Sequence, residues 1–335
     1  MKALVMPGPE QLAVEERPEP GAAEGSALLK VRLVGLCGSD LNSYRGRNPL
    51  VSYPRILGHE IAATVVESGS AEFPAGTEVT MSPYSNCGRC PACLRGRPNA
   101  CQRNETLGVQ RDGALAELLR MPVEKLFKAK LTLRELCLVE PLTVGFHAVA
   151  RGRVQKTDTV AVFGCGGVGL GAIAASAFRG ATTIAIDLDD QKLETARRAG
   201  AAHTLHTGRQ QLHETLLELT DGRGPDVMIE AIGLPSTFRA AVEEVAFTGR
   251  VVYIGYAKEP VAYETKLFVQ KELDVLGSRN ALAEDFREVI RMLEQKRFPV
   301  EEAISVTAPL DAAPEIFAAW SAEPARFTKI MIEVG

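Results

Sequence analysis

The stretch TVAVFGCGGVGLGAIAASAFRG, residues 159–180, determines the fold class of the C-terminal half of this chain. Residues 159–163 have the apolar composition of a buried strand, and residues 164–169 form a Gly-x-Gly-x-x-Gly pattern that leads into an apolar helix. Glycines at these positions permit a tight turn, close approach of the backbone to a pyrophosphate, and close packing of helix on strand. The N-terminus of the helix also presents free N–H groups to phosphates. This stretch therefore predicts a dinucleotide-binding unit.

Strands and helices continue to alternate after this motif. Further strands are predicted at residues 183–187, 203–206, 226–230, 250–255 and 272–278, and helices at residues 189–200, 209–220 and 235–247. Such alternation needs crossover connections, which build a parallel sheet covered by helices on both faces. We therefore expect an α/β, doubly wound Rossmann domain over residues 149–279. A helix with one apolar face is predicted just after it, at residues 283–298.

Candidate cofactor-binding residues lie at the ends of the predicted strands. They are Gly164, Gly166, Gly167, Val168 and Gly169 in the motif, Asp187 at the end of the next strand, and Ala231, Ile254 and Gly255. An acid about twenty residues after such a motif binds a ribose 2′-hydroxyl. Asp189 and Asp190 follow Asp187, and no basic residue comes before Lys192, so NAD is favoured over NADP. The alternative is a glycine-rich packing turn that binds no ligand.

The N-terminal third has a different character. Short apolar runs, for example at residues 27–36, 61–69 and 77–83, are broken by Gly, Pro, Asn and Ser. These runs predict strands of an antiparallel, barrel-like or sandwich unit. The strand-like segments 304–310 and 329–334 share this character, and we expect them to return to the first domain.

Composition and charge exclude several classes of function. Of 335 residues, 46% are hydrophobic and 24% charged, which is typical of a globular protein and argues against disorder. The net charge of −4, with acids and bases mixed along the chain, argues against a nucleic-acid or anionic-membrane partner. No apolar run approaches the roughly 20 residues that span a bilayer, and the first residues lack the pattern of a secretory signal. We expect a cytoplasmic protein with a small-molecule substrate.

Four of the seven cysteines lie in one loop, Cys87-x2-Cys90-x2-Cys93-x7-Cys101. A cytosolic chain keeps its thiols reduced, so this cluster indicates metal ligands rather than disulfides. Four thiolates complete a tetrahedral zinc site without an open position, which indicates a structural role. An iron–sulfur cluster is the alternative with the same ligands. A nucleic-acid-binding zinc module is a second alternative, which the acidic net charge disfavours.

Three further motifs carry reactive side chains at separate positions: Cys37-Gly38-Ser39-Asp40, Gly58-His59-Glu60 and Glu140-Pro141. Taken singly, each has a purely structural interpretation. Cys37 could be a small core residue, His59 a hydrogen-bonded side chain beside a turn, and Glu140 a surface acid.

Together the motifs resemble the zinc-dependent medium-chain dehydrogenase/reductase family over essentially the whole chain. The resemblance is carried by CGSD (37–40), GHE (58–60), the four-cysteine loop, EPLTVGFHA (140–148) and FGCGGVG (163–169), in the family's order and spacing. Within the family, Glu140-Pro141 resembles the polyol and sugar-acid branch, which includes sorbitol, galactitol and threonine dehydrogenases and hexonate 5-dehydrogenases. The resemblance implies a GroES-like, β-rich catalytic domain over residues 1–148 and 280–335, with a structural-zinc loop at 87–101.

The resemblance also implies roles for individual residues. Cys37 and His59 would bind a catalytic zinc, with Glu60 and Glu140 as candidates for the remaining ligand. One thiolate, one imidazole and one carboxylate leave an open position on the metal for substrate. With the structural zinc on Cys87, Cys90, Cys93 and Cys101, we expect two zinc ions per chain in addition to NAD.

Proton transfer is implied for Ser39, which stands where the family has a Ser or Thr. Asn42 departs from the family, because many relatives have a histidine there as the outer end of a proton relay. An amide cannot act as a base near neutral pH. The proton would then leave through water, or through Glu60 or Glu140.

The substrate is only weakly encoded. Carboxylates beside a metal suit a polyhydroxylated substrate, because they accept hydrogen bonds from several hydroxyls. Arg279 and Asn280 follow the last predicted strand, at the sheet edge where ligands bind. Arg279 could form a bidentate pair with a substrate carboxylate, and a contact to the nicotinamide side or a domain-interface ion pair is the equal alternative.

The leading hypothesis is a zinc-dependent oxidoreductase that transfers hydride from a secondary alcohol of a sugar acid or polyol to NAD, giving a keto product. A threonine-type or simple secondary-alcohol dehydrogenase is one alternative. A non-catalytic NAD(H)-binding sensor that keeps only the four-cysteine zinc is another. Family members are usually assembled through the cofactor domain, so a homodimer or homotetramer is expected.

Overall fold

The computed structural model describes residues 1–335, which form two compact units. Unit 1 comprises Met1–Glu140 and Val300–Gly335, and unit 2 comprises Pro141–Pro299. The sequence places the boundaries at 148/149 and 279/280 instead. The first differs because helix α3 (Leu133–Arg151) crosses it, and the second because helix α9 (Ala283–Glu294) is bonded within unit 2 through Asp285 and His147.

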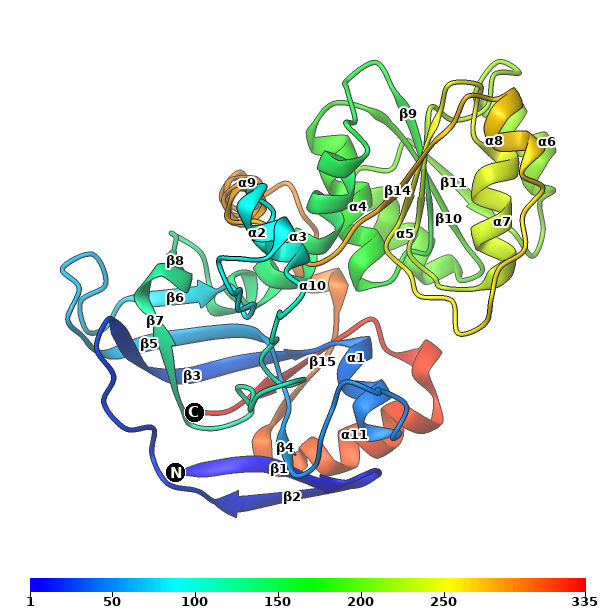
Figure 1. The fold of residues 1–335 in the computed structure, drawn as a ribbon. Coiled ribbons are helices and arrows are strands. Elements are labelled where there is room, and N and C mark those ends of the chain that lie inside the picture. The colour runs from blue at the N-terminus through cyan, green and yellow to red at the C-terminus, as the bar shows by residue number, and fades with distance from the viewer. The chain divides into compact units, whose positions relative to one another are not determined.

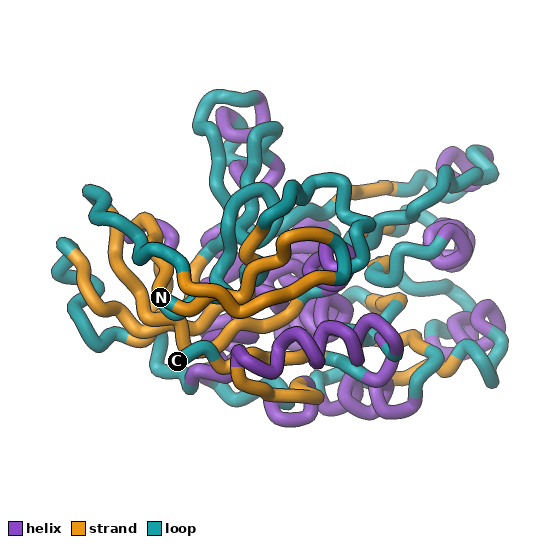
Figure 2. Tube along the Cα trace, turned by 90° about the horizontal axis from the view of Figure 1, so that it is seen from below, coloured by secondary structure: helices purple, strands orange, loops and turns teal.

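Unit 1 is built on a mostly antiparallel sheet (Figure 1), whose strands follow the order β15–β16–β3–β5–β6–β8, with β7 also paired to β3. The C-terminal strand β16 pairs antiparallel with β3, with Ile330 opposite Leu36. Both chain termini lie in this unit, near each other in both views (Figures 1 and 2). The strands of this sheet are β3 (Ser26–Leu36), β5 (Glu60–Ser68), β6 (Glu78–Met81), β7 (Leu118–Pro122), β8 (Leu126–Lys128), β15 (Ile304–Pro309) and β16 (Lys329–Glu333).

A smaller sheet and short helices complete unit 1. The small sheet has the order β2–β1–β4, with β1 (Lys2–Gly8), β2 (Gln11–Glu16) and β4 (Arg55–Ile56). The helices are α1 (Gly38–Tyr44), α2 (Pro91–Leu94), α10 (Val300–Ala303) and α11 (Ala313–Ala322). Apolar side chains such as Leu4, Leu29, Ile61 and Phe317 are fully buried and form one continuous core.

Unit 2 contains a parallel six-stranded sheet with helices on both sides (Figure 1). Its order is β11–β10–β9–β12–β13–β14, which is the doubly wound order in which the strand sequence reverses between β9 and β12. The strands are β9 (Thr159–Phe163), β10 (Thr182–Asp187), β11 (His203–His206), β12 (Val227–Glu230), β13 (Arg250–Tyr253) and β14 (Asp274–Gly277), and the helices beside α9 are α4 (Gly167–Phe178), α5 (Asp190–Arg198), α6 (Leu212–Leu219), α7 (Pro235–Glu244) and α8 (Lys266–Gln270).

Helix α3 was not predicted from the sequence, because Pro141 and Gly145 lie inside it. Gly145 is needed there, since a Cβ would lie 2.1 Å from the backbone nitrogen of Ala172 in α4. The two glycine-containing helices therefore pack backbone against backbone. None of the chain's helices has the combination of length and apolar character that a membrane crossing requires.

Candidate metal and dinucleotide sites

The four-cysteine loop folds into a compact sulfur cluster in unit 1. The ligand atoms of Cys87, Cys90, Cys93 and Cys101 all lie within 4.8 Å of one another. Neighbouring sulfurs are 3.5 Å apart for Cys90–Cys93, 3.8 Å for Cys90–Cys101 and 3.5 Å for Cys87–Cys101. A tetrahedral zinc with bonds of about 2.3 Å separates its sulfurs by about 3.8 Å, so the donor set and its spacing fit zinc.

Backbone N–H groups support thiolates in this loop. The N–H groups of Cys87 and Arg103 both donate to the Cys101 sulfur at 3.3 Å. Backbone hydrogen bonds from Cys93 and Gln102 lower the pKa of Cys90 to about 6. All seven cysteines of the chain are free of disulfides, as a metal-binding interpretation of the loop requires.

A second cluster in unit 1 brings together three side chains that are separate in sequence. Cys37 precedes α1, His59 precedes β5, and Glu60 is the first residue of β5. Their ligand atoms all lie within 4.8 Å of one another. A thiolate, an imidazole and a carboxylate form a donor set that fits zinc with an open position.

The buried carboxylate of Asp40 contacts the backbone and the imidazole of this cluster. Its carboxylate accepts the backbone N–H of Cys37 at 2.8 Å and that of Gly58 at 3.3 Å, and one oxygen lies 3.7 Å from Nδ1 of His59. At 3.7 Å the carboxylate acts on the imidazole through its charge rather than through a hydrogen bond. Burial alone would lower the pKa of His59, but Asp40, Cys37 and Glu140 raise it well above its usual range.

Glu60 is held by a buried lysine from the C-terminal strand. Nζ of Lys329 lies 2.7 and 2.6 Å from the two carboxylate oxygens of Glu60 and donates to the carbonyl of Leu36 at 3.1 Å. Gly35 makes room for this carboxylate, since a Cβ there would lie 2.2 Å from it. Burial would lower the pKa of Lys329, but Glu60 raises it above its usual value, so the ion pair is maintained.

Glu140 lies beside the trio but is not part of it. It occupies α3, one turn beyond Cys137, whose thiol donates to the carbonyl of Glu60 at 3.5 Å. The Glu140 carboxylate accepts a short hydrogen bond from the hydroxyl of Tyr84. Burial raises the pKa of Glu140 to about 7, against the opposing effect of His59 and with a further rise from Glu60. Each candidate carboxylate ligand therefore accepts a hydrogen bond from a different side chain: Glu60 from Lys329, and Glu140 from Tyr84.

Ser39 and Asn42 lie in α1, three residues apart and therefore on one helix face. The hydroxyl of Ser39 lies 3.5 Å from Nε2 of His59. The structure thus places Ser39 beside the cluster.

In the glycine motif of unit 2, each of the three spaced positions favours glycine for a different structural reason. Gly164 has a φ of +93°, which only glycine adopts readily. Gly169 packs so closely that a Cβ would lie 1.7 Å from the carbonyl oxygen of Gly164. Gly166 has open space around it and stands at the N-cap of α4. These three properties are the ones that the turn, packing and close-approach glycines of phosphate-binding loops have. Gly167 and Val168 lie in the first turn of the helix.

Asp187 connects the end of β10 to this loop. Its carboxylate accepts the N–H of Cys165 at 2.8 Å and that of Leu188 at 2.7 Å. Asp189 caps α5, and Asp190 forms a short ion pair with Arg209. Arg209 follows β11 and is a basic residue beside this acidic group. The stretch between Asp187 and Lys192, from which NAD was predicted, does not include it.

Ala231 and the pair Ile254–Gly255 follow β12 and β13, next to the glycine loop in the sheet order. The N–H of Ala231 donates to Phe163, and the N–H groups of Ile254 and Gly255 donate to the carbonyl of Glu230. The predicted cofactor residues therefore gather at one edge of the sheet, where its order reverses.

Arg279 and Asn280 follow β14 at the same end of the sheet. Arg279 is exposed and Asn280 is half-buried with a φ of +52°. Their position agrees with the prediction, but no structural contact identifies a ligand for them.

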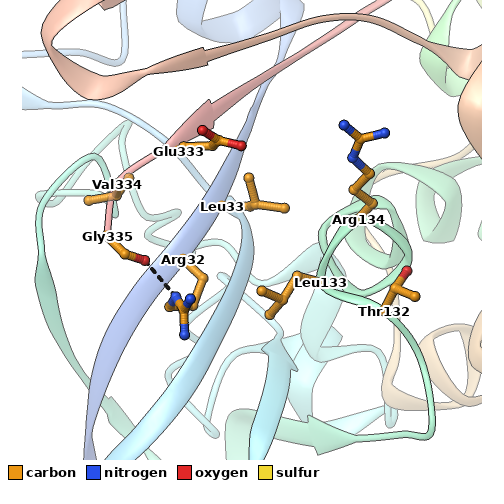
Figure 3. Close-up of a pocket in the computed structure, with 8 residues that line it drawn as sticks. All are labelled: Arg32, Leu33, Thr132, Leu133, Arg134, Glu333, Val334 and Gly335. Atoms are coloured by element: carbon orange, nitrogen blue, oxygen red, sulfur yellow. Dashed lines mark hydrogen bonds between the residues drawn. The ribbon is translucent and has the colours of Figure 1, made fainter.

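A surface pocket of about 590 Å³ lies in unit 1, between β3, β16 and the start of α3 (Figure 3). It contains none of the predicted site residues. Its arginines are engaged, Arg32 with the carbonyl of Gly335 and Arg134 with Glu301.

Three residues around the candidate cluster were given no role from the sequence: Asp40, Tyr84 and Lys329. Asp40 could have been found from the CGSD motif, in which it is the first carboxylate after the cysteine. Tyr84 and Lys329 carry no local signal, because only the fold brings them to Glu140 and Glu60.

Comparisons with known proteins agree with this geometry. The sequence profile described as an alcohol dehydrogenase GroES-like domain matches residues 23–131, and that described as zinc-binding dehydrogenase matches residues 167–295. A sorbitol dehydrogenase of Bacillus subtilis is 36% identical over 83% of this chain and 81% of its own length. An L-galactonate-5-dehydrogenase of Escherichia coli is 30% identical over 95% and 94%. An alcohol dehydrogenase from E. coli CFT073, solved with NADH, superposes with a TM-score of 0.91 at 29% identity, covering 100% of this chain and 99% of that one.

Proposed function

Since the chain belongs to the zinc-dependent medium-chain dehydrogenase/reductase family, we propose that it transfers hydride from a secondary alcohol of a sugar acid or polyol to NAD. As a member of this family it is an oxidoreductase that acts on CH–OH groups. The observation that carries the proposal is the cluster of Cys37, His59 and Glu60, whose ligand atoms lie within 4.8 Å of one another with Glu140 beside them.

In the proposed mechanism, a zinc ion held at the cluster would supply Lewis-acid polarisation of the substrate hydroxyl, and NAD bound to unit 2 would be the hydride acceptor. Cys37 and His59 would hold the metal, and the Asp40 carboxylate, 3.7 Å from Nδ1, would attract the imidazole electrostatically. The hydroxyl of Ser39, which lies 3.5 Å from Nε2 of His59, would take the substrate proton while giving its own proton to a ribose hydroxyl of the cofactor. Asn42 continues the path only as a hydrogen-bonding group, because an amide does not titrate near neutral pH.

The dinucleotide part of the proposal is supported by unit 2. The N-terminal turn of α4 would hold the pyrophosphate over Gly166, where the structure leaves open space. Asp187 would accept hydrogen bonds from the adenosine ribose, which favours NAD over NADP. Asp190 already engages Arg209, so this arginine has its charge partly compensated.

The four-cysteine loop supports a second, structural zinc, because its four sulfurs leave no position for substrate. We propose the reducing cytoplasm as the compartment, where seven free cysteines remain stable.

A homodimer or homotetramer is supported by β14, an edge strand with Val275 45% exposed, whose outer side could pair with a second copy. Sedimentation of the purified protein would test this assembly.

The substrate class is tested by initial rates of NADH formation with matched pairs of a polyol and its aldonic acid. Threonine and simple secondary alcohols belong in the same panel. Turnover of the acids alone would support Arg279 as a carboxylate-binding residue, and Arg279→Met should then raise KM for the acid. Turnover of the neutral polyols alone would leave Arg279 a cofactor or structural role. NADH binding without turnover of any substrate would favour the sensor and overturn the proposal.

A further inference from the structure

Tyr84 is a buried tyrosine that links the two metal-type clusters of unit 1. It is 7% exposed, its hydroxyl donates to the carboxylate of Glu140, and Cys87 of the four-cysteine loop follows three residues later. Resting on the function proposed above, we propose that Tyr84 is a positioning residue for the Glu140 carboxylate, and that the four-cysteine loop keeps Tyr84 in place for this task.

The contact between Tyr84 and Glu140 satisfies a buried carboxylate. Glu140 is 3% exposed, and a buried charge without a hydrogen-bond donor is strongly unfavourable. The tyrosine hydroxyl has one proton to donate, and in this structure the proton is committed to Oε1 of Glu140. That oxygen is therefore engaged, and Tyr84 decides how the carboxylate is turned toward the neighbouring Cys37–His59–Glu60 cluster.

Glu140 and Glu60 differ in how firmly they are held. Both oxygens of Glu60 are engaged by the buried ammonium of Lys329 at 2.6 and 2.7 Å. The contact that Tyr84 makes to Glu140 comes from a neutral phenol. A neutral donor holds a carboxylate less strongly than a charged one, so the Tyr84 contact holds Glu140 less firmly than the Lys329 contact holds Glu60.

Tyr84 in turn is anchored by the two segments that flank the four-cysteine loop. Tyr84 forms an antiparallel bridge with Thr106. On one side of the bridge Ser85 and Glu105 exchange two hydrogen bonds of 2.9 Å, from the N–H of Ser85 to the Glu105 carbonyl and from the N–H of Glu105 to the Ser85 hydroxyl. On the other side the N–H of Leu107 donates to the carbonyl of Pro83 at 3.1 Å.

The two segments that flank the four-cysteine loop are therefore joined at the bridge between Tyr84 and Thr106. Residues 83–85 enter the loop and residues 105–107 leave it, and the Cys87 and Cys101 sulfurs lie 3.5 Å apart just inside the two flanks. A metal bound to both sulfurs would fix the register of the flanks and with it the direction of the Tyr84 side chain. Loss of that metal should therefore change the orientation of the Glu140 carboxylate. The effect would pass through the Tyr84 side chain and not through a cysteine of the loop.

The positioning role is tested with Tyr84→Phe, which removes only the hydroxyl. Tyr53→Phe is the matched control, because Tyr53 of the same unit also donates one hydrogen bond, to the carbonyl of Ser43 at 2.8 Å. We expect Tyr84→Phe to keep the zinc content and the KM for NAD of the wild type, while kcat falls by about tenfold or more. With cobalt in place of zinc, its visible absorption bands should shift relative to wild type. Kinetics and cobalt spectrum equal to those of Tyr53→Phe would overturn the proposal.

The coupling to the loop is tested with Cys93→Ser, alone and combined with Tyr84→Phe. We expect Cys93→Ser to lose one zinc and to lower kcat, and the double variant to lose no more than the lower single variant. Losses that multiply would contradict the coupling. Should Cys93→Ser fail to fold, Ser85→Ala removes one flank hydrogen bond instead, and a kcat equal to wild type would contradict the anchoring.

Failure of the proposed function would look different. Wild-type protein that binds two metal ions but shows no NAD-dependent turnover would contradict the function, and the cobalt spectra of Tyr84→Phe and Tyr53→Phe would still report on Glu140. An active wild type with identical spectra and rates for both variants would contradict the role of Tyr84 alone.

Discussion

Lys329 and Glu60 form a fully buried ion pair in which one ammonium contacts both oxygens of one carboxylate, at 2.6 and 2.7 Å. Lys329 comes from the last strand and Glu60 from β5, so the pair joins the C-terminal segment to the metal-type cluster. Beside it the cluster holds Cys37, Glu140 and Asp40, all of which carry negative charge when ionised. Lys329 supplies one positive charge among them, and His59, whose pKa is raised well above its usual range, supplies another.

We predict that Lys329→Met destabilises the protein by about 3–5 kcal/mol, because it leaves the Glu60 carboxylate buried without its cation. Chemical denaturation of wild type and variant measures the difference. Lys266→Met is the matched control: its ion pair with Glu264 is also 2.6 Å long, but the two side chains are 64% and 66% exposed. The control should change stability by no more than about 1 kcal/mol. Equal effects of the two variants would show that the Lys329 pair is not desolvated as described.

The glycine motif gives a second prediction with an internal control. Gly169→Ala should destabilise the fold by about 1–3 kcal/mol, because the new Cβ would lie 1.7 Å from the Gly164 carbonyl. Gly166→Ala should leave stability unchanged, since nothing lies within 4 Å of its Cβ position, yet it should weaken NADH binding by filling the space that a pyrophosphate would occupy. Thermal unfolding and NADH titration separate the two effects. Unchanged NADH affinity in Gly166→Ala would place the dinucleotide elsewhere.

The role of Asp187 is tested with Asp187→Asn, which preserves the shape of the side chain. We expect kcat/KM with NAD to fall by about tenfold or more, as for loss of a hydrogen bond to a charged group, and the ratio of NAD to NADP efficiency to fall with it. Asp274→Asn, an exposed acid of the same unit that pairs with Arg153, should leave the ratio unchanged. An unchanged ratio in Asp187→Asn would remove this residue as the selector.

Much of unit 2 was predictable because its signals are local. Strands β9 and β11 lie at the predicted residues 159–163 and 203–206. The glycine motif follows strand β9 and leads into helix α4, as predicted. The predicted family, fold class and cofactor class, zinc with a nicotinamide dinucleotide, are confirmed by the family profiles and relatives. Helices α1, α3 and α11 were not predicted. In α3 the reason is tertiary: Gly145 is retained for close packing on α4 and masks the helical pattern.

The candidate metal cluster was predictable in its residues but not in what surrounds them. Cys37, His59 and Glu60 stand in short motifs, and the structure brings them together. Their partners depend on contacts between distant segments. Lys329 lies 269 residues from Glu60 and Tyr84 lies 56 from Glu140, and neither differs locally from an ordinary strand or loop residue.

The measurement that tests the central claim most directly is the zinc content, NADH binding and turnover of Cys37→Ala beside the wild type, with the best substrate of the panel. We expect two zinc ions per wild-type chain and one per variant chain, with NADH bound equally by both. Turnover should be lost in the variant, because the catalytic metal would have lost its thiolate ligand. A variant that oxidises the substrate as fast as the wild type would contradict the assignment of the Cys37–His59 cluster as the active centre.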